Sequence, residues 1–355
     1  MAKILIKNGR VWDGGQFFFA DVLTEGEIVA KIEPNINDSA DYIFDAAGRI
    51  VSAGLVDSHV HMRVLKDDQY GIQAEMSCFP FGVTAAADAG RRKGEKAIMD
   101  SFMLKNVVFI SAKIQSDRAD IETLEAEIAK FGDKVAGIKV YFDTAGTEVT
   151  SIQPLVDVCN YATKRHLPVM VHCTNSPVSM GELLDTLKPG DMLTHCFHGA
   201  INHATEDDYE YMKAAQKRGV IIDTGCAGYV HTNFAVMQKA FDAGLFPDSI
   251  STDITKNSAY RRGGRYGMTM CMSLAKSLGM HEEDIFRAVT SNPAKALGKA
   301  QEWGYLKVGS TADIAVLDYC DEGFALTDKA GNHVESPMGY RCVLTVSDGL
   351  VVYRH

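Results

Sequence analysis

The feature that most constrains the fold is a series of short apolar β-type runs separated by segments of helical length. Eight such runs lie at 50–60, 82–87, 107–112, 135–141, 169–172, 192–195, 220–223 and 250–253. Parallel strands need long crossover connections, and eight strand–helix units close a (β/α)8 barrel. The pattern therefore predicts an α/β chain with a TIM barrel, although the run at 107–112 is ambiguous in type and leaves the count open by one.

Both ends of the chain contain shorter β-type runs joined by turn signals. They lie at 3–7, 17–22, 28–32, 312–318, 341–347 and 350–353, with Asn8-Gly9 and Asp348-Gly349 among the turns. Asn-Gly and Asp-Gly pairs favour hairpin turns. We expect residues 1–50 and 305–355 to form one small β-sandwich domain, and residues 51–304 to form the barrel.

The composition excludes several classes of partner. The net charge is −10, whereas nucleic acids and anionic membranes attract basic surfaces. No run reaches the length of a membrane span or resembles a signal peptide, so we expect a cytoplasmic protein. The eight cysteines are scattered without CxxC spacing, which indicates reduced thiols. Two-fold association is common among soluble oligomers, so a homo-oligomer is a possible assembly of this chain.

Two histidines stand one residue apart at the end of the first apolar run. Because side chains alternate along a strand, His59 and His61 point to the same side and could hold one metal ion. Two ordinary surface histidines are the alternative, because the motif is short.

Groups that can bind metal recur at or near the ends of four more runs. They are Lys139, His172, His195 and Asp253. The carboxyl ends of barrel strands converge on one face, where catalytic groups lie, so these residues together indicate a site. Lys139 is flanked by Ile138 and Val140, so burial of its ammonium is costly unless the charge is paired or removed. An edge position with the amine in solvent is the alternative for this lysine.

The stretch from Asp57 to Arg63, followed by Lys139, His172, His195 and Asp253 in that order, resembles the amidohydrolase superfamily. It is similar in particular to the binuclear branch with a carboxylated lysine, which includes dihydroorotases, hydantoinases and D-aminoacylases. Residues 290–298 and 304–316 are similar to the segment by which that family returns to its small β-sandwich. The resemblance therefore extends over nearly the whole chain.

This resemblance implies a role for each residue of the set. His59, His61 and Asp253 would bind one divalent metal ion, His172 and His195 a second, and Lys139, carboxylated by CO2, would bridge the two. Imidazole and oxygen ligands favour zinc, with manganese and iron as alternatives. A hydroxide between the metals would attack the substrate carbonyl, with Asp253 as the general base.

Segments 168–172, 190–199 and 248–253 resemble dihydroorotase-like deacetylases more than true dihydroorotases, and members of that branch resemble enzymes that remove acyl groups from N-acetyl-D-amino acids or O-acetyl hydroxy acids. We therefore predict a metal-dependent deacylase that hydrolyses an amide or ester. A cyclic amidohydrolase of dihydroorotase or hydantoinase type is the first alternative. A mononuclear deaminase and a non-catalytic scaffold are further alternatives, disfavoured by Lys139 and by the complete ligand set.

Three residues are candidates for contact with a small, carboxylate-bearing substrate. Arg63 matches the dihydroorotase-type His-x-His-x-Arg pattern, in which the arginine binds a carboxylate, with a structural ion pair as the alternative. Cys226 stands where the deacetylase branch has a histidine, with a buried filler thiol as the alternative. His198 lies on the loop after the sixth run, and the loop histidines His203 and His231 are weaker candidates.

Overall fold

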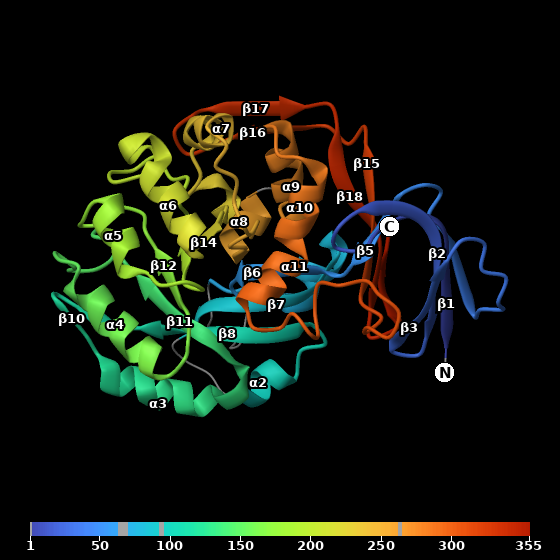
Figure 1. Cartoon of the computed structure of the whole chain (residues 1–355), viewed down its shortest axis with the longest axis horizontal. Coiled ribbons are helices and arrows are strands. Elements are labelled where there is room, and N and C mark those ends of the chain that lie inside the picture. Colours follow the sequence, from blue (N-terminus) through green and yellow to red (C-terminus); the bar gives the residue numbers. More distant parts are fainter. Residues whose placement is uncertain (1, 63–69, 92–95, 262–264) are drawn as a thin grey trace.

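The computed structural model describes residues 2–62, 70–91, 96–261 and 265–355 (Figure 1). Arg63 therefore lies outside the described residues. Seven parallel strands form the barrel sheet, in the spatial order β14-β13-β12-β11-β8-β7-β6. Their bounds are β6 Leu55–Val60, β7 Val83–Arg91, β8 Lys105–Ala112, β11 Val135–Tyr141, β12 Val169–His172, β13 Met192–Thr194 and β14 Ile221–Asp223.

The eighth predicted run closes the barrel without forming a regular strand. Parallel bridges join Ser249 to Asp223 at the end of β14, and Ile254 to Val60 at the end of β6. The segment between these bridges therefore occupies the eighth position, and the fold is a TIM barrel with a small β-sandwich domain.

Helices cover the outside of the barrel sheet (Figure 1). They are α1 Ala74–Cys78, α2 Lys96–Asp100, α3 Ile121–Phe131, α4 Gln153–Lys164, α5 Met180–Thr186, α6 Glu210–Arg218, α7 Phe234–Asp242, α8 Lys256–Arg261, α9 Met268–Ser277, α10 Glu282–Val289 and α11 Ser291–Ala296. Side chains cap several of them at the N-terminus, as Asp120 does for α3 and Asn233 for α7. None of the helices described is long and apolar enough to cross a membrane.

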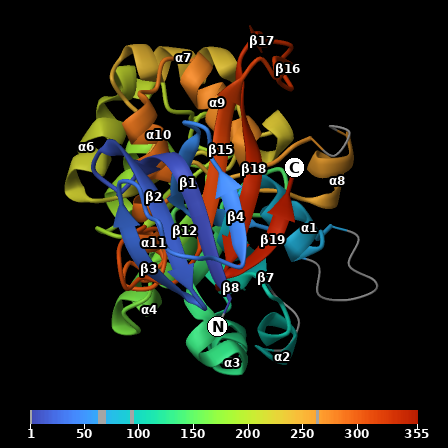
Figure 2. The ribbon, with the colours of Figure 1, turned by 90° about the vertical axis from the view of Figure 1, so that its right-hand side faces the viewer.

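A second sheet combines strands from both ends of the chain (Figure 2). It contains β1 Lys3–Trp12, β2 Phe17–Glu25, β3 Ile28–Glu33, β4 Tyr42–Asp45, β5 Ile50–Ala53, β15 Ile314–Cys320, β18 Gly339–Ser347 and β19 Leu350–Arg354. Apolar side chains of the two ends share one buried cluster that includes Ile6, Val22, Ile314 and Leu344. The division of the chain at residues 50 and 305 stays a prediction.

The first predicted run is not one strand, and this is a correction. β5 pairs with β1 and β15 in the terminal sheet, whereas β6 pairs with β7 in the barrel. The break falls at Gly54, where a Cβ atom would lie 2.0 Å from Oγ1 of Thr84. Only glycine permits this close approach, so the chain changes sheets there.

Two short antiparallel pairs complete the strands described, β9 Ile114–Gln115 with β10 Arg118–Ala119 and β16 Phe324–Thr327 with β17 His333–Ser336. The β16–β17 hairpin lies beside α7, at the top of Figures 1 and 2. A hydrogen bond from the Phe234 backbone N–H to Oδ2 of Asp328 (2.8 Å) ties the turn of the hairpin to the start of α7. The hairpin therefore extends from the terminal sheet to the barrel loops.

The register of the barrel strands brings several polar residues to one level. Tyr141 pairs with His172, His172 with Thr194, and Thr194 with Asp223, across β11 to β14. These residues come from four separate parts of the sequence. Parallel strands in register thus assemble a polar row at the carboxyl end of the barrel.

Candidate metal centre

A cavity of about 270 Å³ lies at the carboxyl end of the barrel strands. Its walls contain all six residues that the sequence predicts as metal ligands. The lining residues are His59, His61, Tyr70, Ala89, Gly90, Ser111, Lys139, Tyr141, His172, His195, His231 and Asp253. The folded chain therefore gathers the predicted ligand set in one place.

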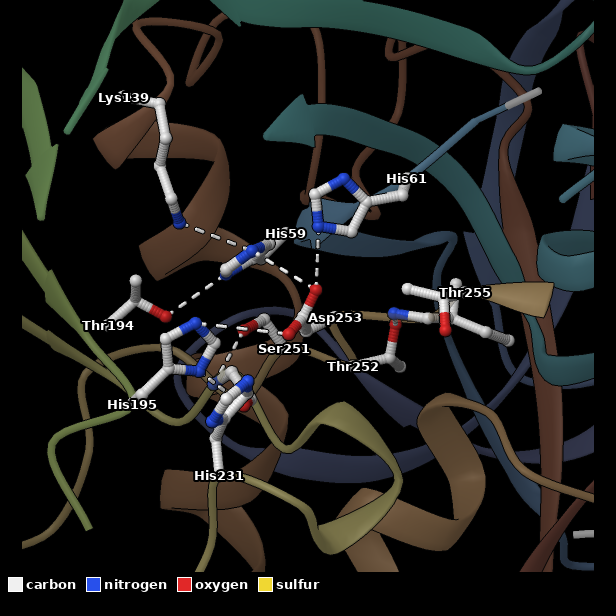
Figure 3. A network of polar contacts seen from close by, with 12 residues as sticks. His59, His61, Lys139, Thr194, His195, His231, Ser251, Thr252, Asp253 and Thr255 are labelled. Carbon is white, nitrogen blue, oxygen red and sulfur yellow. Dashed lines mark hydrogen bonds and ion pairs between the residues drawn. The ribbon is translucent and has the colours of Figure 1, made fainter. Parts of the chain in front are cut away.

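His59, His61 and Asp253 form the tightest group in this cavity (Figure 3). Nε2 of His61 lies 2.8 Å from Oδ1 of Asp253, and Nε2 of His59 lies 3.4 Å from the same oxygen. One ligand atom from each residue lies within 4.8 Å of the other two. This donor set of two imidazoles and a carboxylate suits a divalent metal ion such as zinc.

Hydrogen bonds on the far side of His59 define which of its nitrogens faces the cavity. The hydroxyl of Thr194 donates to Oδ2 of Asp223 (2.7 Å), so its oxygen accepts from Nδ1 of His59 (3.0 Å). Nδ1 therefore carries the proton, and Nε2 presents a lone pair to the cavity. Metal-binding histidines are usually oriented by such a bond from the other ring nitrogen.

His195 is oriented in the same way by a backbone carbonyl. Its Nδ1 lies 2.7 Å from the carbonyl oxygen of Gly225, which only accepts hydrogen bonds. Nε2 therefore has a free lone pair and lies 3.8 Å from Oδ2 of Asp253. A Cβ atom on Gly225, whose φ is +48°, would lie 2.4 Å from this Nδ1, so glycine is required for the contact.

The carboxylate of Asp253 lies beside the ring nitrogens of several histidines, and two of these nitrogens, Nε2 of His59 and of His195, present lone pairs. Oδ1 of this carboxylate is buried and lies 2.8 Å from Nε2 of His61 and 3.4 Å from Nε2 of His59. Burial alone would raise the pKa of Asp253, but the surrounding His59 and His61 lower it below its usual range. A buried anion beside inward lone pairs is stable only with a compensating cation, so the residues fit a metal ion.

The backbone at two of these positions is held in the left-handed region. The φ angle is +65° at His195 and +46° at Asp253. Residues other than glycine seldom adopt this conformation, which is concentrated at functional sites. A hydrogen bond from the Asp253 N–H to the carbonyl of His59 (2.7 Å) holds the aspartate beside β6.

Lys139 is buried in the cavity wall, and its ammonium forms no ion pair with a carboxylate among the described residues. Its Nζ lies 3.3 Å from Nε2 of His59 and 3.2 Å from Sδ of Met170. Burial lowers the pKa of Lys139 to about 8. The side chain is therefore placed where loss of its positive charge would stabilise the protein.

His172 also lines the cavity, and its ring centroid is 4.5 Å from that of His195. Its Nε2 lies 3.3 Å from Oδ2 of Asp143, a carboxylate that the sequence did not single out. Burial lowers the pKa of both His59 and His172 to about 4. Both rings are therefore neutral near pH 7, which is the form that binds metal.

His231 is a central residue that sequence reasoning treated as a weak candidate. Its ring centroid lies 4.7 Å from that of His195 and 5.0 Å from that of His172, and it lines the cavity. It belongs to an irregular loop between β14 and α7. No periodicity in the sequence could have indicated this position.

The three predicted substrate contacts have different outcomes. Arg63 is not among the residues described. The structure does not bring Cys226 to the cavity: its side chain is buried beside Cys271, because the turn at Gly225 directs the following residue into the core. His198 is also buried, but it lines a second cavity that adjoins the first.

Comparison with known proteins agrees with this geometry. Residues 50–351 match the amidohydrolase family. A protein named deacetylase from Enterococcus faecalis is 29% identical over 92% of this chain and 93% of its own length. A crystal structure of a dihydroorotase superimposes with a TM-score of 0.87 at 25% identity, covering 99% of this chain and 98% of the other. A crystal structure of an adenine deaminase gives 0.86 at 25% identity over both full chains.

The family match covers most of the chain. It includes every residue that lines the cavity of about 270 Å³ around His59, His61 and Asp253, called here the metal-type cavity. The likeness to solved structures covers both the barrel and the terminal sheet. The chain belongs to the amidohydrolase family and is a hydrolase.

Proposed function

We propose that this hydrolase is a metal-dependent deacylase that cleaves an amide or ester bond of a small substrate. N-acyl amino acids and O-acetyl hydroxy acids are the substrate classes proposed. The observation that carries the proposal is the convergence of six potential ligands, with the Nε2 lone pairs of His59 and His195 directed into one cavity. The similarity to the Enterococcus faecalis deacetylase supports the reaction type.

Two divalent metal ions, zinc being the preferred metal, are proposed to occupy this cavity. His59, His61 and Asp253 would hold one ion, His172 and His195 the other, and Lys139 would be shared between them after carboxylation by CO2. Within the described parts of the chain, Nζ of Lys139 has no anionic partner in contact, which supports carboxylation, because a carbamate replaces a buried cation with an anionic oxygen ligand. When bound, such metals supply Lewis-acid polarisation of a carbonyl and a water of lowered pKa.

The residues of the chain itself would then orient the substrate and move protons. Asp253 is ionised and buried, so it is the proposed general base that passes a proton to the leaving group. Thr194 and the carbonyl of Gly225 would keep His59 and His195 in their ligand tautomers. His231 lines the same cavity and is proposed to contact the substrate.

A cyclic amidohydrolase is the second candidate, because the dihydroorotase structure superimposes so completely on this chain. The same ligands would serve ring opening as well as deacylation. A mononuclear deaminase would hold one metal ion and a non-catalytic scaffold none. Because this chain is also similar to an adenine deaminase structure, the number of bound metal ions must be measured.

The first experiment is metal analysis by mass spectrometry on protein purified without chelator, with Lys139→Ala measured alongside. About two equivalents of zinc, lost in the variant, are expected from a bridged pair of metals. One equivalent or none, unchanged in Lys139→Ala, would contradict the proposal. Active protein is then assayed with N-acetyl-D-amino acids, O-acetyl hydroxy acids and cyclic ureides, and hydrolysis of the ureides alone would favour the second candidate.

The cellular setting is proposed from the charge and composition of the chain. We propose a cytoplasmic enzyme without nucleic-acid or membrane partners. A homo-oligomer is the remaining prediction, and light scattering coupled to size-exclusion chromatography measures it directly.

A further inference from the structure

A second cavity, of about 390 Å³, adjoins the metal-type cavity. The two share Tyr141 and His231 in their walls. The second cavity, called here the Lys329 cavity, is also lined by Asn175, His198 and Lys329. A substrate held at the first cavity can therefore extend past Tyr141 and His231 into this space.

His198 lines the Lys329 cavity, and one of its ring nitrogens has no hydrogen-bond partner among the described residues. Its side chain is 2% exposed, and its Nδ1 accepts a hydrogen bond from the backbone N–H of Ala200 (3.2 Å). The neutral ring therefore carries its proton on Nε2. This buried Nε2 has no hydrogen-bond partner in the described part of the chain. A buried donor of this kind is stabilised by a ligand that supplies an acceptor.

Lys329 brings a positive charge to the same cavity from a distant part of the sequence. It lies in the turn between β16 and β17, and its backbone N–H donates to the carbonyl of Tyr229 (3.3 Å). The neighbouring Asp328 accepts hydrogen bonds from the N–H of Phe234 and from Asn332 (2.8 and 2.9 Å). These bonds tie the hairpin to the loop before α7 and set the position of Lys329.

The Lys329 ammonium forms no ion pair with any carboxylate among the described residues. Asp143 is an acid in the wall of the same cavity, and it already has other partners. It accepts from the N–H of Ala145 (2.6 Å) and from Nδ2 of Asn175 (3.2 Å), and it lies 3.3 Å from Nε2 of His172. Lys329 therefore remains available to a ligand.

We propose that the Lys329 cavity binds the carboxylate of the substrate, with Lys329 supplying the charge and Nε2 of His198 a hydrogen bond. A carboxylate has only acceptors, which complements a cation and an unsatisfied N–H donor. The substrates are then acylated amino or hydroxy acids with a free carboxylate, and neutral esters or amides bind less well. This inference rests on the proposed deacylase function for its choice of substrate class.

The test uses the metal-loaded enzyme with N-acetyl-D-phenylalanine and with its primary carboxamide. In Lys329→Ala we expect KM for the acid to rise about tenfold with kcat nearly unchanged, and KM for the carboxamide to stay as in the wild type. Lys217→Ala is the matched control, because Lys217 is an exposed lysine on α6. Lys329→Arg keeps the charge and is expected to recover most of the affinity.

A second pair of variants tests His198. His198→Phe removes the Nε2–H donor and is expected to raise KM for the acid, whereas His198→Gln retains a donor and restores binding. Because His198 is buried, circular dichroism and metal content are measured for both. If only His198→Phe misfolds, KM for the acid is compared between His198→Gln and Lys329→Ala. We then expect a KM near that of the wild type in His198→Gln and a raised KM in Lys329→Ala.

A binding measurement separates failure of this inference from failure of the deacylase function. Calorimetric titration with N-acetyl-D-phenylalanine requires no turnover. Weaker binding of the acid in Lys329→Ala supports the carboxylate site even for a protein that does not deacylate it. An active deacylase whose KM values for acid and carboxamide respond equally, or not at all, to Lys329→Ala overturns the inference and leaves the function standing.

Discussion

The two cavities that meet at Tyr141 and His231 are built from different parts of the fold. The metal-type cavity takes its proposed metal ligands from the ends of barrel strands and their immediate continuations, as in His59 and His172. The Lys329 cavity is lined mostly by loops after strands and by the tip of the β16–β17 hairpin. One is therefore part of the barrel frame, and the other is assembled from connections.

In the proposed function, this difference separates the residues that carry out the reaction from those that recognise the substrate. Strands in register hold ligand groups in precise positions, as chemistry at a metal requires. Loops tolerate change in length and sequence, so they set which substrate reaches that chemistry. The following variants test the division, beginning with the largest expected effect.

Asp253→Asn should cause the largest loss. Removing the proposed general base while keeping the shape of the side chain is expected to lower kcat by about a thousandfold or more. Most of the metal should remain, because His59, His61 and the other ligands are unchanged. Activity and metal content are measured on the same preparation, and substantial turnover in this variant would remove Asp253 from its role.

Thr194→Val tests whether the inner cavity depends on its supporting hydrogen bonds. The variant leaves Nδ1 of His59 without its partner (3.0 Å), so metal affinity is expected to fall about 10- to 100-fold. Competition with a metal-binding dye measures the affinity. Thr186→Val, in the exposed last turn of α5, is the control and should bind metal normally. Equal affinity in all three proteins would show that Thr194 does not orient a ligand.

His231→Phe tests the residue at the junction of the two cavities. We expect kcat/KM to fall about tenfold with unchanged metal content, because the ring lies against His195 and His172 without being one of the proposed ligands. His203→Phe is the control, since His203 is outside the lining of both cavities. Loss of metal in His231→Phe would move this residue into the ligand set.

Asp328→Ala should have the smallest effect and should act only on the loop-built cavity. It removes acceptors for Phe234 N–H and for Asn332, so the free energy of unfolding is expected to fall by about 1–3 kcal/mol. We also expect KM for the acid to rise about threefold, because Lys329 loses its anchor. Denaturant unfolding and kinetics are compared with Asp117→Ala, at an exposed position. A large fall in metal content would contradict the separation of the two cavities.

The barrel could be predicted, and a set of candidate metal ligands proposed, because both depend on local patterns in the sequence. Apolar β-type runs separated by segments of helical length indicate the barrel strands, and His59, His61 and Lys139 were recognisable from their positions in such runs. The extent of the first run was wrong, because the change of sheet at Gly54 depends on the contact with Thr84, which is distant along the chain. Cys226 was chosen by comparison with a motif, and its burial beside Cys271 depends on the turn at Gly225.

The sequence by itself determined that His59 and His61 share one side of a strand end, because strand geometry is a property of neighbouring residues. It also determined that a buried lysine at position 139 needs its charge paired or removed. Only the tertiary structure decided that Thr194 orients His59, that His231 enters the site, and that Lys329 reaches the adjoining cavity. These contacts depend on the paths of loops and on packing between distant segments, which no local periodicity encodes.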